Sequence, residues 1–394
     1  MDYEFRIRTR LVFGAGSIER LGELASELSF RRTLLVADPG LKDAGYAQRA
    51  LGLLDKVGIE AFPFHDFGIN PDSEVISAGH SFASLLNVDS IIGLGGGSSL
   101  DCAKGINLLL TNGGRVQDYF GYGKPAKPLL PMIAVPTTAG TGSEAQSYAV
   151  LSDAATHKKL ACGAAGLAFR VAVLDPELTL SQPREVTAAS GFDAIAHAVE
   201  TWVSTKRTPI SELFSREAWR LLESNYETVL RQSDNLRARE AMQLGACYAG
   251  IAIENSMLGA THACANPLTA NYGTTHGEAL AMLLPSVVRW NGEMSAERYA
   301  ELLRGSGRES DDPVRTLAQR LEQLAAAGGL QTRLSGKGIV PEELSSLAVD
   351  AAEQWTGRFN PRPFTYDGAL EVYRLAYESA DSSLAETDVE LKAR

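Results

Sequence analysis

The first half of this 394-residue chain alternates short, continuous apolar runs with stretches of helical spacing. The apolar runs are rich in Val, Ile and Leu, and most of them end in Gly, Pro or Asp. A strand that is apolar along its whole length is typical of a parallel sheet covered by helices on both faces. The predicted strands are Thr33–Ala37, Ser90–Leu94, Met132–Val135 and Val171–Leu174, and the predicted helices include Ser17–Leu28 and Ser99–Leu110.

The strand pattern stops after about Pro183. Long segments with helical spacing follow it, at Ala188–Val203, Ile210–Arg231 and Leu236–Met257, and more of them continue to the end. We therefore predict two domains, an α/β domain over residues 1–184 and an all-helical domain over residues 185–394. Ligands of two-domain enzymes tend to bind in the cleft between the domains.

Composition and charge exclude several classes of protein. The net charge of −11 and the pI near 5.2 argue against a nucleic-acid or anionic-membrane partner. The N-terminus lacks the pattern of a signal peptide, and no apolar run approaches the roughly 20 residues that span a bilayer. The four cysteines are scattered without a CxxC pair, so we expect reduced thiols and a cytoplasmic location. They are Cys102, Cys162, Cys247 and Cys264.

A glycine-rich segment, Gly93–Asp101, follows one predicted strand and opens a helix. Glycines let the backbone approach a pyrophosphate closely, and a helix N-terminus offers free N–H groups to an anion. Ser98 or Ser99 is a candidate cap for that helix. The alternative is a tight strand-to-helix turn without a ligand.

Two further segments favour a dinucleotide. Pro136–Glu144 follows another predicted strand and presents hydroxyl groups at the same expected edge. Asp38 ends the strand Thr33–Ala37, where a carboxylate would accept hydrogen bonds from a ribose diol and repel a 2′-phosphate, which favours NAD over NADP. The order departs from the usual fingerprint, in which the acid follows the glycines by about 20 residues. Either the fold is a variant doubly wound sheet or Asp38 is only a turn residue.

Three of the six histidines lie in the helical half of the chain and are candidate metal ligands together with one aspartate. Asp193 and His197 are spaced i, i+4, which places both on one helix face. His262 and His276 are candidates for the remaining ligands, and this donor set suits Fe(II) or Zn(II). The alternative is a capping aspartate with core histidines. Glu200 and Glu254 are further acidic candidates, for which a solvent-facing or salt-bridged role is favoured.

The combined pattern resembles the iron-containing (group III) alcohol dehydrogenases, relatives of lactaldehyde reductase and 1,3-propanediol dehydrogenase. The resemblance covers nearly the whole chain. It is carried, in order, by FGAG, GGGSSLD, PTTAGTGSE, DPEL, GFDAIAHAVE, HACANPL, THGEALAMLLP and Asn360-Pro361-Arg362.

The resemblance implies a Rossmann-like NAD-binding domain and an all-helical metal-binding domain, in the superfold of dehydroquinate synthase. It implies interconversion of a small alcohol and its aldehyde or ketone, with NAD, with Fe²⁺ or alternatively Zn²⁺, and in a homo-oligomer, with a dimer favoured. The implied metal ligands are Asp193, His197, His262 and His276. The implied dinucleotide-binding residues are Asp38, Asn70, Gly96, Gly97, Ser98, Asp101, Thr137, Thr138, Thr141, Lys159 and Leu178.

One departure from the family pattern affects the proton route. The family has a nicotinamide-facing histidine four residues after the third ligand, and this chain has Asn266 there. Asparagine cannot take up a proton at neutral pH, so ordered water or the ribose hydroxyls would carry the proton. Two alternatives therefore stay open, a lyase of the dehydroquinate synthase kind and a catalytically impaired relative that retains cofactor and metal.

Overall fold

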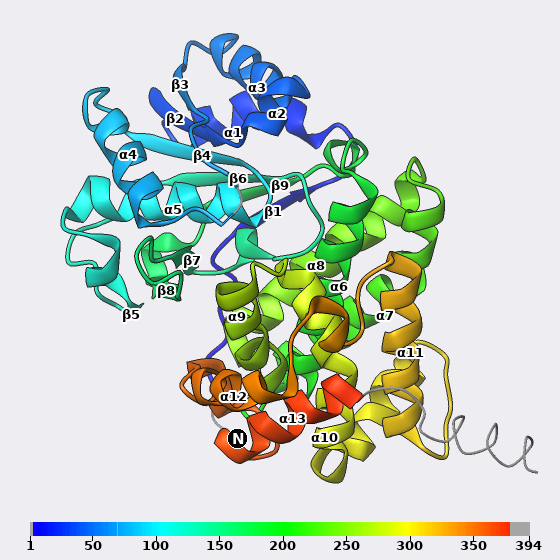
Figure 1. Ribbon diagram of the computed structural model, residues 1–394. Coiled ribbons are helices and arrows are strands. Elements are labelled where there is room, and N and C mark those ends of the chain that lie inside the picture. The colour runs from blue at the N-terminus through cyan, green and yellow to red at the C-terminus, as the bar shows by residue number, and fades with distance from the viewer. Residues whose placement is uncertain (1–2, 69, 379–394) are drawn as a thin grey trace, which may run out of the picture.

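The computed structural model describes residues 3–68 and 70–378 of the chain. A parallel sheet with its helices forms the upper part of the molecule in Figure 1, and a body of helices forms the lower part. The final residues of the predicted helical domain, 379–394, lie outside the described residues.

The main sheet has six strands in the order β1-β9-β6-β4-β2-β3, and every neighbouring pair is parallel. This confirms the predicted parallel sheet. The strands β1 and β3 were not predicted, because β1 has only four residues and β3 contains Pro63. The bounds are β1 Arg10–Phe13, β2 Arg32–Ala37, β3 Glu60–Phe64, β4 Ser90–Gly95, β6 Met132–Pro136 and β9 Val171–Leu174.

Two apolar layers explain why the central strands are apolar throughout. Successive residues of a strand point to opposite faces of the sheet. Leu34 and Ile91 accordingly pack into one layer with α4 and α5, while Leu35 and Ile92 pack into the other with α1 and α3. Figure 1 shows these helices on opposite sides of the sheet. Their bounds are α1 Leu21–Glu27, α2 Pro39–Asp43, α3 Tyr46–Asp55, α4 Ser73–Ser84 and α5 Gly97–Asn112.

A second, smaller sheet packs against α5. Its three strands are β5 (Gly121–Tyr122), β8 (Lys159–Gly163) and β7 (Tyr148–Ser152), in that order. The sequence patterns do not predict this sheet, because its strands are short and carry polar residues among the apolar ones. It nevertheless carries Lys159, one of the residues implied for dinucleotide binding.

The second half of the chain is helical, as predicted, and packs around one apolar core. Its central helix is α6, in which every residue from Gly191 to Val203 is buried. A helix buried on all sides must pair its polar groups internally, because unpaired polar groups are costly away from water. The bounds are α6 Arg184–Val203, α7 Pro209–Arg231, α8 Leu236–Ser256, α9 Ala260–Tyr272, α10 His276–Gly305, α11 Pro313–Gly328, α12 Leu344–Ala352 and α13 Tyr366–Glu378.

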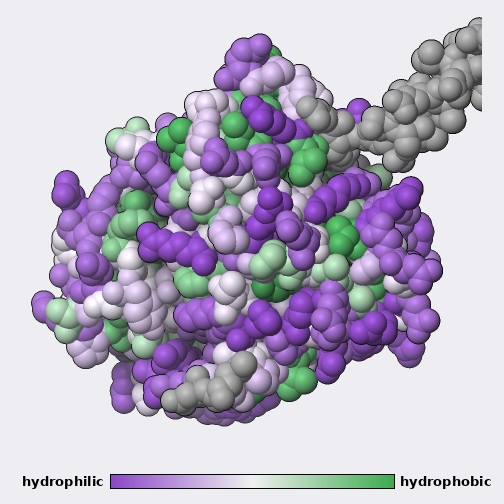
Figure 2. Space-filling view, turned by 90° about the horizontal axis from the view of Figure 1, so that it is seen from below, coloured by the Kyte–Doolittle hydropathy of each residue, from purple (hydrophilic) through white to green (hydrophobic). Residues whose placement is uncertain are grey.

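The face seen in Figure 2 is largely hydrophilic, with apolar side chains in small separate groups. Among the described residues, none of the helices combines the length and the hydropathy that a bilayer crossing requires. The apolar residues of the long helices are instead buried in the core.

A glycine–glycine contact joins the two halves of the molecule. Gly142, in the loop after β6, has φ 62° and lies against Gly250 of α8. A Cβ atom added to Gly250 would lie 2.5 Å from the backbone oxygen of Gly142. Backbone on both sides leaves no flexible side chain to give way, so this contact admits only glycine.

We expect Gly250→Ala to destabilise the protein by ~1–3 kcal/mol, the usual cost of overpacking, despite the better helix propensity of alanine. Gly52→Ala in α3 is the control, because a Cβ there meets no atom within 4 Å. That control should gain stability by ~0.5–1 kcal/mol. Urea unfolding measures both, and a Gly250→Ala protein as stable as the wild type would contradict the tight contact.

Candidate functional site

The strand order places a topological switch point at the carboxyl edge of the sheet. The strand β2 lies between β3 and β4, so the chain passes outward to β3 and then returns across β2 to form β4. The loops that leave β2 and β4 therefore diverge, and open α/β sheets bind ligands at such a point. Asp38 follows β2 and the glycine loop follows β4, which explains why the acid can precede the glycines and still lie beside them.

The glycine loop begins α5 without a side-chain cap. Gly95 has φ 143°, and α5 starts at Gly97 with Gly96 at the N-cap. The prediction that Ser98 or Ser99 caps this helix is wrong, because the helix starts ahead of both residues. Ser98 Oγ instead accepts from the backbone N–H of Asn70 at 3.2 Å, and Ser99 Oγ donates to Asp38 Oδ2 at 3.3 Å. With no capping side chain, the N–H groups of the first turn remain available to an anion.

The hydroxyl-rich loop after β6 packs directly on the glycine loop. A Cβ atom on Gly96 would lie 3.1 Å from Thr138 Cγ2, and one on Gly97 would lie 2.5 Å from Thr141 Cγ2. The backbone N–H of Thr137 donates to the carbonyl oxygen of Gly95 at 3.1 Å. The two loops thus form one continuous surface at the edge of the sheet.

Asn70 and Lys159 lie together beside this surface. Lys159 Nζ donates to Asn70 Oδ1 at 2.8 Å, and Asn70 adopts a left-handed backbone with φ 55°. Burial lowers the pKa of Lys159, although Asp101 opposes this shift. Its contact with Asn70 places the Lys159 amine at the same edge as the α5 N-terminus.

Two of the residues implied for the dinucleotide have other contacts within the protein. Asp101 accepts from Ser143 Oγ at 2.6 Å and from the backbone N–H of Val150 at 3.1 Å. Leu178 is 1% exposed and belongs to the apolar layer beneath the sheet. Asp101 thus links α5 to the segments that contain Ser143 and Val150, and the side chain of Leu178 lies in the core.

The structure brings all four candidate metal ligands together. His197, His262 and His276 each place Nε2 near Asp193 Oδ1, at 3.1, 3.6 and 3.8 Å respectively. The rings of His197 and His262 stack with centroids 4.8 Å apart. Within the described part of the chain, one ligand atom each from Asp193, His262 and His276 lies within 4.8 Å of the others. His197 joins this group through its contact with Asp193.

Two buried atoms at the centre of this group have no protein partner. Neither Asp193 Oδ1 nor His262 Nε2 makes a hydrogen bond with any of the described residues. Buried polar atoms are almost always paired, so such orphaned atoms require a ligand or ion. One carboxylate with imidazole nitrogens is the donor set of Fe(II) and Zn(II), so the residues fit a divalent transition metal.

One side of the group is open. The side chain of His276 is 32% exposed, whereas those of Asp193 and His262 are 6% and 5% exposed. A catalytic metal site keeps one position accessible to substrate. The exposure of His276 places that access on the side of α10.

Burial and charge set the protonation of the imidazoles. Burial lowers the pKa of His197 to about 4 and that of His276 to about 3, although Asp193 opposes both shifts. Burial also acts to lower the pKa of His262, but Glu200 and Asp193 outweigh it and raise that pKa to about 9. For Asp193 burial acts to raise the pKa, and the imidazoles reverse this and hold it well below its usual value. His262 is thus the one ligand candidate that carries a proton near pH 7.

Glu200 is salt-bridged, which is one of the two roles predicted for it, and its partner is a candidate metal ligand. Glu200 is 4% exposed rather than solvent-facing, accepts from the backbone N–H of Thr261 at 2.6 Å, and pairs with His262 Nδ1. A carboxylate on the far nitrogen fixes a ligand imidazole with its other nitrogen toward the metal. Its position three residues after His197, in the same buried helix, was the available signal. Glu254, by contrast, binds Ser147 and lies 3.8 Å from Arg8, as the salt-bridged alternative predicted.

Asn266 lies in the same helix as His262, one turn further along α9. Its Nδ2 donates to Gln354 Oε1 at 3.0 Å. Gln354 immediately precedes Trp355, whose ring stacks with that of Tyr148 at 5.9 Å. Asn266, the residue that departs from the family pattern, is therefore hydrogen-bonded to a segment near the C-terminus.

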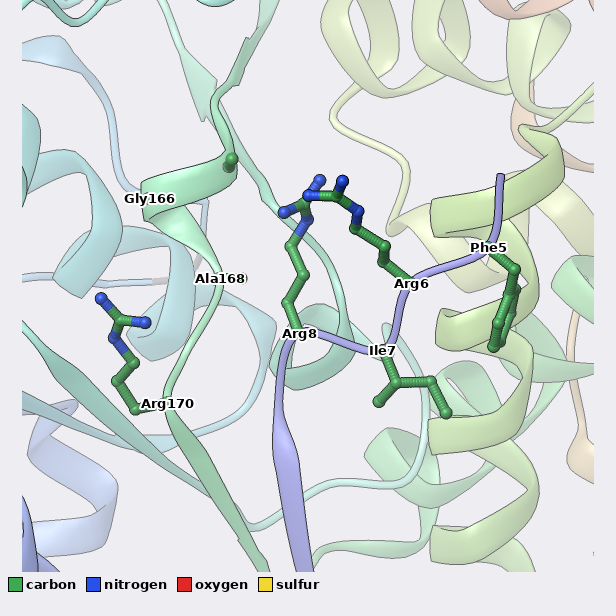
Figure 3. Close-up of a pocket in the computed structure, with 8 residues that line it drawn as sticks. Phe5, Arg6, Ile7, Arg8, Gly166, Ala168 and Arg170 are labelled. Carbon is green, nitrogen blue, oxygen red and sulfur yellow. The ribbon is translucent and has the colours of Figure 1, made fainter. Parts of the chain in front are cut away.

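Two surface cavities lie elsewhere, beside the N-terminal segment. One of about 500 Å³ is shown in Figure 3, where Arg6 and Arg8 lie side by side and Arg170 stands apart from them. The other, of about 600 Å³, is lined in part by Tyr122 and Tyr148. Neither is lined by a candidate metal ligand or by a residue implied for the dinucleotide, so these cavities are separate from the imidazole group.

We expect metal affinity to rise about tenfold per pH unit between pH 6 and 9, because binding must displace the His262 proton. His197 and His276 are neutral across this range, so they add no dependence. Competition titration with a chromophoric chelator measures the slope. In Glu200→Gln the slope should flatten, because the charge that raises the pKa of His262 is gone. A wild-type affinity that is constant over this range would contradict the assignment.

Comparisons with known proteins agree with the geometry. The family described as iron-containing alcohol dehydrogenase matches residues 8–176, and its C-terminal part matches residues 187–377. An NAD-dependent methanol dehydrogenase of Bacillus methanolicus is 30% identical, over 94% of this chain and 99% of its own length. An alcohol dehydrogenase of Oenococcus oeni superposes with a TM-score of 0.92 and 32% identity, over 95% of this chain and 100% of its own. A sulfoacetaldehyde reductase of Bifidobacterium kashiwanohense, solved in complex with NAD⁺, superposes with a TM-score of 0.88 and 28% identity. The match covers 96% of this chain and 100% of that chain.

Proposed function

This chain belongs to the iron-containing alcohol dehydrogenase family, and we propose that its reaction takes place at Asp193, His197, His262 and His276. It is an NAD-linked oxidoreductase that interconverts an alcohol with its aldehyde or ketone. The observation that carries the choice of site is the buried Asp193 Oδ1, within 3.8 Å of three imidazole nitrogens. We propose Fe²⁺ as the metal, with Zn²⁺ as the alternative.

The chain's own residues prepare the site for substrate and cofactor. Asp193, His197, His262 and His276 would hold the metal, which would supply Lewis-acid polarisation of the substrate oxygen, and a nicotinamide would supply or accept the hydride. Glu200 holds His262 with Nε2 toward Asp193, and the exposed edge of His276 admits the substrate. Asn266 does not titrate near neutral pH, so the proton reaches solvent by way of water or ribose hydroxyls.

The dinucleotide is proposed to bind along the carboxyl edge of the sheet. Asp38 would accept from the adenosine ribose, and the first turn of α5 would hold the pyrophosphate. The Lys159 amine lies at the same edge. The remaining proposed contacts are Asn70, Gly96, Gly97, Ser98, Asp101, Thr137, Thr138, Thr141 and Leu178, the last through its backbone.

Three broader features are also proposed. The domains would meet at residues 184 and 185, in the first turn of α6. The chain would form a homodimer, with exposed Tyr3 and Ile7 of the N-terminal segment in the interface. The buried free thiols favour a reducing cytoplasmic location.

The test of the proposed function uses protein purified without oxygen. Bound metal is quantified by mass spectrometry, and loss of NADH absorbance is followed with a panel of small aldehydes. About one metal per chain, with turnover that a chelator abolishes, is the expected result. Bound metal with no turnover would favour the lyase or the impaired relative, and absence of metal would refute the ligand set.

We expect His276→Ala to lose at least about 100-fold in metal affinity and to lose turnover. Removing a residue that only orients a metal ligand costs up to about 100-fold in affinity, and removing the ligand itself should cost more. His80→Ala, at a half-buried position of α4, is the control. Metal content and the NADH-linked rate are measured together. Full activity of metal-free His276→Ala would refute a metal-dependent reaction.

We expect Asp38→Ala to shift the ratio of kcat/KM for NADH over NADPH downward by ~10- to 100-fold, since charged hydrogen bonds contribute ~1.5–3 kcal/mol. Asp38 also caps α2, so Asp312→Ala, which removes the α11 cap, controls for lost capping. An unchanged ratio in Asp38→Ala would show that this carboxylate is only a turn residue.

A further inference from the structure

Asn266 lies on the helix that carries His262, one of the proposed metal ligands. It follows His262 by four residues in α9, and residues at this spacing share one face of a helix. Its side chain is half-buried. The inference drawn from Asn266 rests on the proposed function, because the space beside the proposed metal ligands is taken to hold an alcohol and a dinucleotide.

Gln354 determines which way the Asn266 amide is turned. Gln354 Nε2 donates to the backbone carbonyl oxygen of Asp350 at 3.3 Å. A carbonyl oxygen only accepts, so Gln354 must direct its NH₂ group to Asp350 and its Oε1 the other way. That Oε1 accepts from Asn266 Nδ2 at 3.0 Å. The hydrogen bond to the backbone therefore fixes the orientation of the Gln354 amide, and that amide in turn fixes the orientation of the Asn266 amide.

The segment that carries Gln354 is itself anchored. The backbone N–H of Gln354 donates to the carbonyl oxygen of Ala351 at 3.0 Å. The next residue, Trp355, stacks with Tyr148 of β7 at 5.9 Å and meets the edge of Phe359 at 5.9 Å. Contacts on both sides therefore fix the backbone from which Gln354 reaches Asn266.

The consequence is an acceptor atom that the protein leaves available. Asn266 Oδ1 accepts no hydrogen bond from any residue in the described ranges, and it is not among the buried atoms without a partner. We propose that Gln354 is a positioning residue, which holds Asn266 so that Oδ1 accepts a hydrogen bond from a hydroxyl group of a bound ligand.

Two ligands can supply that hydroxyl. One is a substrate with a second hydroxyl group besides the reacting one, and the other is the dinucleotide through a ribose. A reacting aldehyde or ketone offers only acceptor atoms, so the carbonyl group itself gains nothing from Oδ1. The shared chemistry is a neutral hydroxyl donor, and separate measurements distinguish its source.

The experiment compares Gln354→Met, Gln354→Glu and Asn266→Leu in the metal-loaded enzyme. Methionine keeps the length of glutamine and removes its strong acceptor, whereas a glutamate carboxylate still accepts from Asn266 Nδ2. Gln323→Met, at an exposed position of α11, is the matched control. Metal content and thermal midpoint verify that each protein is intact.

The substrate arm measures kcat/KM for 1,2- and 1,3-propanediol relative to 1-propanol. The cofactor arm measures the Kd of NADH by fluorescence, without substrate. We expect Gln354→Met and Asn266→Leu to lower the diol preference or to weaken NADH by ~3- to 10-fold, the effect of one neutral hydrogen bond. Gln354→Glu still accepts from Asn266 Nδ2 but loses the donor to Asp350, so its loss should be smaller than that of Gln354→Met, and Gln323→Met should retain the wild-type values.

Each outcome decides the proposal. A change in the diol ratio assigns the hydroxyl to the substrate, and a change in the NADH Kd assigns it to the cofactor. Unchanged values in Gln354→Met and Asn266→Leu overturn the proposal, as does an equal loss in Gln354→Met and Gln354→Glu, which marks a merely structural role. If the wild type turned over no alcohol, the proposed function would fail, while the NADH arm would still decide the role of Gln354.

Discussion

The buried carboxylate of Asp193 is the constraint on which the rest of the helical domain depends. It sits in α6, a helix with no solvent-facing side along its central length. A charge in that position is tolerated only with a compensating charge nearby, and the protonated His262, whose Nε2 lies 3.6 Å from Oδ1, provides one. The N-terminus of α10 must approach α6 closely to deliver His276, and the next residue is accordingly a glycine. A Cβ atom on Gly277 would lie 2.0 Å from the carbonyl oxygen of Ala189.

Similar close approaches bring the carboxyl edge of the sheet to the helical body that holds the imidazole group. The loop after β6 lies over α6, since a Cβ atom on Gly140 would be 2.8 Å from the carbonyl oxygen of Ser190. Gly142 of that loop lies against Gly250 of α8. The glycines of PTTAGTGSE are therefore needed for the contact between the two halves of the molecule, whether or not they also contact a ligand. This loop joins the carboxyl edge of the sheet to the helical body. A single reaction can therefore use groups from the sheet edge and groups from the helices.

Local patterns predicted the parts of the fold that local physics sets. The central strands are apolar on both faces because both faces are covered, and periodicity exposes this directly. The small sheet of β5, β8 and β7 has no such pattern and depends on packing against α5. The serine caps were mispredicted for a related reason. Ser98 and Ser99 find partners in Asn70 and Asp38, which are distant in sequence.

The sequence by itself determined the parallel sheet, the helical second half and the pairing of Asp193 with His197, because strand and helix periods fix which side chains share a face. Tertiary structure alone decided that His262 and His276, on other helices, converge on Asp193. It also decided that Glu200 faces His262 and that Gln354, 88 residues away, turns the amide of Asn266. Such contacts follow from how helices pack, and no periodicity within one segment encodes the position of another.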